Sequence, residues 1–170
     1  MPSFQRRFYH RPGELFADFA YLLKRRAAIR QAMRSDQVSE AFRERLMLAV
    51  TQVNGCRYCS YFHAREALKA GISNDELQAL LSGELSQQVP EQEITALLYA
   101  QHWAESNAQP DPATRQRLID TYGQERSAAI EIILRMIRMG NLLGNLWDYL
   151  LYKSSFGRWG LLEHERNARE

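Results

Sequence analysis

The C-terminal third of the chain places the strongest constraint on the fold. Between about residues 124 and 152, apolar residues recur at helical spacing on two faces of one segment. One stripe contains Ile133, Ile137, Gly140, Gly144, Trp147 and Leu151, and the other contains Ile132, Met136, Met139, Leu143, Leu146 and Leu150. A helix that is apolar on two faces is buried on both, inside a bundle or between subunits. The segment is therefore predicted to be the longest helix, packed among other helices.

Charged residues in this helix argue against a membrane span, because charges near the centre of a bilayer are costly. They are Glu131, Arg135, Arg138 and Asp148. Gly140 and Gly144 instead indicate the close approach of a neighbouring helix in a protein core. Asn141 and Asn145, four residues apart on the same helix, are interpreted as hydrogen-bonding groups at an interface.

The rest of the chain shows the same helical periodicity. No window alternates apolar and polar residues with period two between turn residues, so no strand is predicted. Apolar stripes, caps and terminal glycines predict six further helices, at about residues 14–33, 36–54, 56–70, 74–81, 90–106 and 112–123. Ser35 and Asp36 are predicted to cap the second of these, and residues 83–89 form the most loop-like stretch. The predicted class is an all-α helical bundle of about seven helices.

Composition limits the compartment and the partners. A chain of 170 residues suits a single domain, and its net charge of +2 is too small to argue for a nucleic-acid or membrane partner. Residues 1–11 contain no apolar run of the kind found in signal peptides. Two cysteines without such a signal indicate a reducing, cytoplasmic location, where a CxxC pair is more often catalytic or metal-binding than a permanent cross-link.

The only two cysteines, Cys56 and Cys59, lie three residues apart, directly after the predicted helix end at Asn54-Gly55. If a helix begins at Cys56, its unpaired N–H groups and its dipole stabilise a thiolate, and thiols so placed have pKa values of about 3.5–7.5 instead of about 8.5. His63 follows Cys59 by four residues and so lies on the same helix face. It can accept the proton of Cys59. The three side chains therefore have the parts of a redox centre.

A base works better when a second group orients it, and three acidic residues are candidates for that role. Glu44 lies on the preceding predicted helix, twelve residues before Cys56. Antiparallel packing of the two helices would bring it to His63, but Glu40 and Glu66 compete for the same position. The surrounding Arg43-Glu44-Arg45 also fits a solvated charged face, so spacing alone leaves the choice open.

Two other uses of the cysteines compete with redox chemistry. Both thiols could be buried structural residues, or Cys56, Cys59, His63 and Glu44 could supply four zinc ligands. Structural zinc sites usually combine a CxxC pair with a second pair of Cys or His ligands, which this sequence lacks, so no metal is predicted. A c-type haem would need a histidine directly after Cys59, where Ser60 stands.

Aromatic residues flank the cysteine pair. Tyr58 and Phe62 either pack in the core or form an apolar wall for a lipophilic hydroperoxide or a partner thiol. His102, on a separate predicted helix, is a third candidate for the same cavity, although a histidine there also fits ordinary core packing. These three residues are the predicted substrate-pocket residues.

The segments around the cysteines resemble a known superfamily. They are Glu44-Arg45-Leu46, Val53-Asn54-Gly55-Cys56-Arg57-Tyr58-Cys59, His63, and Ala67-Leu68-Lys69-Ala70-Gly71-Ile72-Ser73. The glutamate, the CxxCxxxH motif and the helix that ends in glycine are similar to the alkylhydroperoxidase D-like branch of the carboxymuconolactone decarboxylase-like superfamily. The likeness is close over residues 40–82. It implies one helical domain over residues 1–170, with residues 1–36 and 154–170 as flanking segments, in a homo-oligomer (dimer, trimer or hexamer).

The resemblance also implies a role for each residue. Cys59 is expected to be the thiolate that peroxide oxidises to a sulfenic acid, and Cys56 the proton donor that then resolves it as a disulfide. His63 and Glu44 are expected to relay protons. The implied function is a thiol-dependent peroxidase whose only redox group is the Cys56–Cys59 pair, with an external dithiol or thiol protein as reductant. A general disulfide oxidoreductase and a non-enzymatic, redox-sensing helical oligomer remain alternatives.

Overall fold

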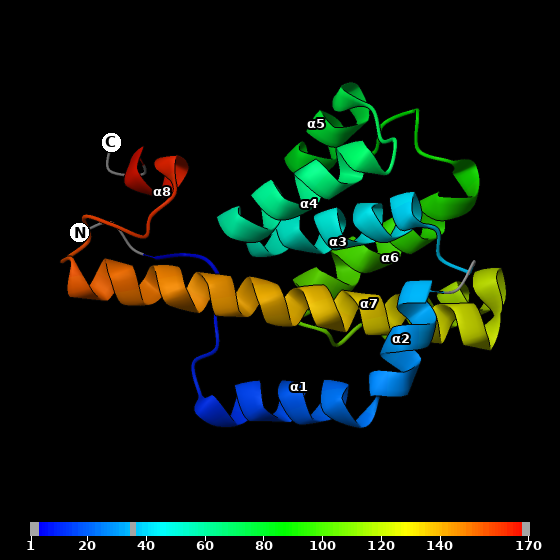
Figure 1. The fold of residues 1–170 in the computed structure, drawn as a ribbon, viewed down its shortest axis with the longest axis horizontal. Helices are drawn as coiled ribbons and strands as arrows, with labels where there is room; N and C mark the ends of the chain where they lie inside the picture. The colour runs from blue at the N-terminus through cyan, green and yellow to red at the C-terminus, as the bar shows by residue number, and fades with distance from the viewer. Residues whose placement is uncertain (1–3, 35–36, 168–170) are drawn as a thin grey trace.

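The computed structural model describes residues 4–34 and 37–167. Over this part of the chain it contains helices and no strand, so the predicted all-α class is confirmed (Figure 1). The helices are α1 (Pro12–Lys24), α2 (Arg26–Arg34), α3 (Glu40–Asn54), α4 (Arg57–Lys69), α5 (Asn74–Ser82), α6 (Glu91–Glu105), α7 (Pro112–Ser154) and α8 (Glu163–Asn167). None of them is long and apolar enough to cross a membrane.

Helix α7 runs along the whole molecule, with α3 to α6 on one side and α1 on the other (Figure 1). It starts at Pro112, where the Asp111 side chain caps the helix by accepting the backbone N–H of Thr114 at 2.9 Å. Gly123 interrupts it with a left-handed φ of 75°, which an L side chain adopts only at a cost. The two helices predicted on either side of Gly123 are therefore confirmed as two stretches joined by a kink.

The core lies where α3, α6 and α7 meet. Its fully buried side chains include Phe42, Leu46, Leu97, Trp103 and Ile133. Burial of such side chains is the main stabilising contribution in a helical domain of this size. The opposite end of α7 is different, because Leu143, Trp147 and Leu150 are 39%, 57% and 51% exposed in the single chain. Their burial between subunits stays a prediction.

The helix predicted over residues 14–33 is in fact two helices, so that prediction is wrong. Arg25 leaves helical geometry, with φ −106° and ψ 19°, and its backbone N–H bonds to the carbonyl of Leu22. The Arg25 guanidinium stacks on the ring of Tyr21, 3.8 Å from its centroid. The break lets α1 and α2 take different directions against α7. Apolar spacing alone does not reveal it, because the same stripe continues through Arg25.

Two further differences concern the flanking segments. Ser35 and Asp36, the predicted cap of the second helix, lie outside the described residues, and α3 is capped by Ser39, whose Oγ accepts the N–H of Phe42 at 3.2 Å. Helix α8 was not predicted. Its buried Glu165 accepts hydrogen bonds at 3.2 Å from the Arg6 side chain, so the two ends of the chain are joined.

The remaining helix boundaries agree with the prediction and place the cysteines. Helix α5 begins at the Ser73 cap, and residues 83–89 form the connection to α6. Helix α3 ends at Gly55, whose φ of 69° is left-handed. After this single turn α4 begins and packs back on α3. The CxxC motif therefore lies at the N-terminus of α4, as predicted.

Candidate active site

Cys56 is the N-cap residue of α4. Its sulfur accepts the backbone N–H of Cys59 at 3.3 Å, in the place where a serine or aspartate oxygen commonly caps a helix. Both cysteines are free thiols. Cys56 is fully buried, whereas Cys59 is partly exposed. The two thiols are therefore unequal in their access to solvent.

The thiols are also unequal in acidity. The pKa of Cys56 is lowered to about 7, chiefly because the Cys59 thiol donates to its sulfur, and further because backbone N–H groups of Cys59 and Tyr58 do so, while burial opposes the shift. The pKa of Cys59 is raised, because it donates to Cys56, is buried and lies beside the negative charge of Cys56. Cys56 is thus the more acidic thiol and Cys59 the more accessible one.

A histidine and a glutamate lie beside the pair. His63 Nδ1 is 2.7 Å from Glu44 Oε2, and both side chains are largely buried. Since a carboxylate only accepts hydrogen bonds, Nδ1 carries the proton of this bond, and Nε2 is the nitrogen that remains to exchange a proton with the site. The competing glutamates lie elsewhere: Glu66 pairs with Lys69 at 2.7 Å, and Glu40 is exposed near Arg43. Glu44 is therefore the acid that orients His63.

Cys59 and His63 open into one cavity of about 340 Å³ between α3, α4 and α7. Most of its lining is apolar, and the lining residues are Met47, Tyr58, Cys59, Phe62, His63, Met136, Ile137 and Gly140. Tyr58 and Phe62, predicted as pocket residues, lie in this lining. Cys56 does not. A molecule in the cavity can reach the sulfur of Cys59 without reaching that of Cys56.

His102, the third predicted pocket residue, lies away from this cavity. It is on α6, its side chain is 43% exposed, and its Nε2 is 3.2 Å from the Asp111 carboxylate at the start of α7. The face of α6 that points to the core is formed by other residues, including the fully buried Leu97 and Trp103. The prediction that His102 lines the cavity beside Cys59 is therefore corrected: His102 contacts Asp111 at the α6–α7 connection.

Helix α7 supplies three site residues that the sequence did not assign. Asn141 lowers the pKa of Cys59 by hydrogen bonding, against the larger effects that raise it. Gly144 lies against Cys56, and a Cβ atom there would be 2.7 Å from the Cys56 sulfur. Asp148 is fully buried and accepts hydrogen bonds from Tyr58 at 2.8 Å and from Arg57 and Arg6 at 2.7 Å each. Small and amide residues on a predicted buried helix indicate a close helix contact with hydrogen bonds across it. The pattern does not indicate that the contacting helix is α4 with its two cysteines.

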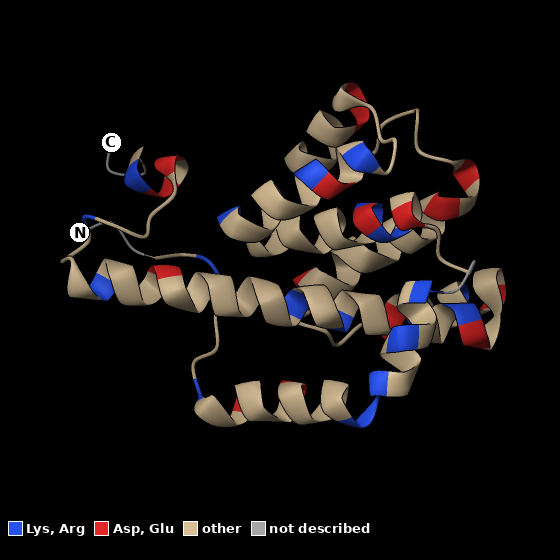
Figure 2. Cartoon of the chain, in the orientation of Figure 1, with Lys and Arg blue, Asp and Glu red and all other residues tan. Residues whose placement is uncertain are grey.

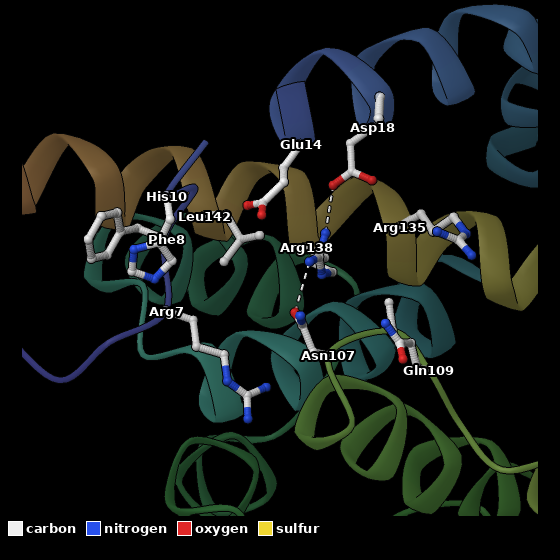
Figure 3. A pocket seen from close by; sticks show the side chains of 12 residues that line it. Arg7, Phe8, His10, Glu14, Asp18, Asn107, Gln109, Arg135, Arg138 and Leu142 are labelled. Carbon is white, nitrogen blue, oxygen red and sulfur yellow. Dashed lines mark hydrogen bonds and ion pairs between the residues drawn. The ribbon is translucent and has the colours of Figure 1, made fainter. Parts of the chain in front are cut away.

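A larger cavity of about 610 Å³ lies between α1, α7 and the α6–α7 connection (Figure 3). Its central charges are paired: Arg138 donates to Asp18 at 2.6 Å and to the Asn107 side chain at 2.8 Å. Among the described residues that line it, none is a cysteine. Of the two cysteines, Cys59 lines the smaller cavity.

The zinc alternative depends on whether ligands converge. Within residues 4–34 and 37–167, no group of three or more His, Cys, Asp or Glu side chains is arranged to hold a metal ion. Moreover, the Nδ1 atom of His63 is engaged by Glu44, and the Cys56 sulfur is engaged by the N–H of Cys59. Acidic and basic residues are spread over several of the described helices, and basic residues follow one another along α2 (Figure 2).

Comparison with known proteins gives a family. A model of the carboxymuconolactone decarboxylase family matches residues 20–104, which is half of the chain. Comparisons with curated proteins and with solved structures gave no match. The matched range includes Glu44, Cys56, Cys59 and His63, whereas α7 lies beyond it. The chain belongs to the carboxymuconolactone decarboxylase family.

Proposed function

We propose that the protein is a thiol peroxidase of the alkylhydroperoxidase D-like kind, which reduces an organic hydroperoxide at Cys59. One observation carries the proposal: Cys59 lines the cavity beside the His63–Glu44 pair. Cys56 lies outside the cavity, within hydrogen-bonding distance of Cys59. A nucleophile, a resolving thiol and an oriented histidine that transfers protons are the groups that this reaction requires.

The first step uses the proton that the two sulfurs share. Cys59 passes it to Cys56 along their hydrogen bond and becomes the thiolate. This thiolate attacks the terminal oxygen of R–O–OH, so that an S–O bond forms and the O–O bond breaks. The alkoxide RO⁻ takes the proton from Cys56 and leaves as an alcohol. The peroxide is reduced by two electrons, and Cys59 is oxidised to a sulfenic acid.

The second step closes the disulfide. The Cys56 thiolate attacks the sulfur of the sulfenic acid, an S–S bond forms, and the S–O bond breaks. The departing hydroxide takes a proton delivered by His63 and leaves as water, and His63 regains its proton from solvent. An external dithiol then reduces the disulfide by exchange and is itself oxidised, which restores both thiols.

A second function has one observation in its favour. Thiols whose pKa lies near the ambient pH attack disulfides best, and the pKa of Cys56 is lowered to about 7. A disulfide oxidoreductase would use Cys56 in this way. Its full burial opposes that role, because a partner disulfide must reach the attacking sulfur.

The test measures consumption of cumene hydroperoxide with dithiothreitol as the dithiol donor. We expect turnover by the wild type and none by Cys59→Ser. Without dithiothreitol, Cys56→Ser should consume a single equivalent of hydroperoxide, and its Cys59 should then be labelled by dimedone. Absence of dimedone labelling at Cys59 after peroxide treatment of Cys56→Ser would contradict the proposal. Reduction of a test disulfide without any peroxide consumption would favour the oxidoreductase.

A further inference from the structure

Helix α7 covers the two sulfurs with one face. Gly144 allows the close approach: a Cβ atom on it would lie 2.7 Å from the sulfur of Cys56 and 4.0 Å from that of Cys59. Asn141 lies three residues earlier and so on the same face, and it is fully buried. The Asn141 side chain is thus held on the face of α7 that meets the two cysteines.

The orientation of the Asn141 carboxamide is set by α3. Its Oδ1 accepts the side-chain N–H of Asn54 at 3.1 Å, and its Nδ2 donates to Thr51 Oγ1 at 3.0 Å. A carboxamide nitrogen has two N–H groups. The bond to Thr51 uses one, which leaves the second for the sulfur of Cys59. Hydrogen bonding from Asn141 accordingly lowers the pKa of that thiol. Asn141 is therefore a neutral donor, fixed before any substrate arrives.

Such a donor meets a specific need of the reaction. The groups that can change the charge around Cys59 are Cys56 and His63 on α4, Glu44 on α3, and Asp148 on α7 with its partners Arg57 and Arg6. The negative charge on Cys56 opposes a thiolate on Cys59. A neutral N–H donor stabilises that thiolate without an ionic partner, and a hydrogen bond to a charged group is stronger than one to a neutral group.

We propose that Asn141 is a further catalytic residue, whose side-chain N–H stabilises the Cys59 sulfur in its anionic form. This inference rests on the proposed function, in which the Cys59 thiolate attacks the hydroperoxide. It concerns a residue beyond the stretch that matches the family, on a helix 82 residues further along the chain than Cys59.

The test measures how fast iodoacetamide alkylates Cys59 as a function of pH. A Cys56→Ser background leaves Cys59 as the one thiol, and serine keeps the helix cap. Asn141→Ala should raise the midpoint by about one pH unit, an about tenfold loss of thiolate at fixed pH. Asn141→Asp has nearly the same shape and can still accept from Asn54, but it turns an acceptor toward the sulfur. It should raise the midpoint further than Asn141→Ala.

Ser127→Ala is the matched control, since it removes a buried side-chain hydrogen bond, to Leu118, elsewhere on α7. Its midpoint should stay at that of the background. An unchanged midpoint in folded Asn141→Ala or Asn141→Asp would overturn the proposal. If neither variant folds, the side-chain amide proton of Asn141 is followed by NMR through the titration of Cys56→Ser. A shift that tracks Cys59 ionisation supports the bond, and its absence overturns it.

The alkylation readout is independent of peroxide chemistry. A raised midpoint in a protein that consumes no hydroperoxide would refute the proposed function and leave the effect of Asn141 on Cys59 standing. An unchanged midpoint in an active peroxidase would refute only the role of Asn141.

Discussion

Gly144 and Cys56 are packed so closely that the smallest side chain cannot be added between them. A Cβ atom on residue 144 would lie 2.7 Å from the Cys56 sulfur, well inside van der Waals contact. The contact joins α7 to the first turn of α4, and it fixes the Cys56 thiol at the helix N-terminus. Since Cys56 is also fully buried, its sulfur has little room to move away.

Gly144→Ala should therefore displace Cys56 from its cap position. Overpacking of a core costs about 1–3 kcal/mol, and the better helix propensity of alanine returns up to about 1 kcal/mol of that. We expect a lower free energy of unfolding and slower disulfide formation after peroxide treatment. Urea unfolding and a thiol assay measure the two effects.

Gly140→Ala is the matched control on the same helix, because nothing lies within 4 Å of a Cβ atom there. It should raise the free energy of unfolding by about 0.5–1 kcal/mol. If both alanine variants form the disulfide as fast as the wild type, the contact at Gly144 does not position Cys56.

The acidity of Cys56 predicts a titration in the neutral range. Its pKa is lowered from 9.0 to about 7, so ultraviolet thiolate absorbance should rise as the pH passes upward through about 7. The shift also stabilises the fold: this contribution is complete above the unfolded thiol's pKa of 9.0 and is lost as the pH falls through about 7.

Cys56→Ser should remove the absorbance step near neutral pH. Cys59→Ala removes the side chain that donates to Cys56, so the Cys56 step should remain and move to higher pH. A step that survives unchanged in Cys56→Ser would assign the acidic thiol to Cys59 instead.

The pairing of Glu44 with His63 predicts a graded loss of activity. Glu44→Ala should leave His63 unoriented and lower the rate of peroxide consumption by about 10–100-fold. This is less than the about 100–10,000-fold that general acid–base catalysis contributes, because His63 itself remains. Glu44→Gln keeps an acceptor for His63 Nδ1 but loses the charge, so its rate should lie between that of the wild type and that of Glu44→Ala. Glu66→Gln is the matched control, since Glu66 pairs with exposed Lys69, and its rate should equal that of the wild type. Equal rates in all four proteins would exclude Glu44 from the reaction.

Local sequence was a good guide to the dithiol and a poor one to its surroundings. The Asn54-Gly55 helix end and the spacing of His63 are short-range features, and they place the CxxC motif at a helix N-terminus. The choice of Glu44 came from resemblance, because three glutamates satisfied the spacing. Arg6 and Asp148, 142 residues apart, form an ion pair that no periodicity encodes. The same holds for His102, whose partner Asp111 lies beyond the end of its own helix.

The open space at Gly140 predicts control of substrate size. This residue lines the cavity of about 340 Å³ beside Cys59, and a larger side chain there would fill part of it. Gly140→Leu should lower the rate with cumene hydroperoxide relative to hydrogen peroxide by about tenfold or more, the scale on which pocket volume discriminates between substrates. Gly140→Ala should change the ratio less. An unchanged ratio in Gly140→Leu would mean that the hydroperoxide reaches Cys59 by another route.

Arg6 predicts a large loss of stability, because it is buried between two buried carboxylates. Its guanidinium is 2.7 Å from Asp148 and 3.2 Å from Glu165, and it also donates to the carbonyl of Gly160. Removing one partner of a buried ion pair leaves an uncompensated charge and costs about 3–5 kcal/mol. Arg6→Ala should therefore lower the free energy of unfolding by about that amount in urea titrations. Lys69→Ala removes an exposed pair and should change it little. A small loss for Arg6→Ala would mean that the two ends of the chain contribute little to the fold.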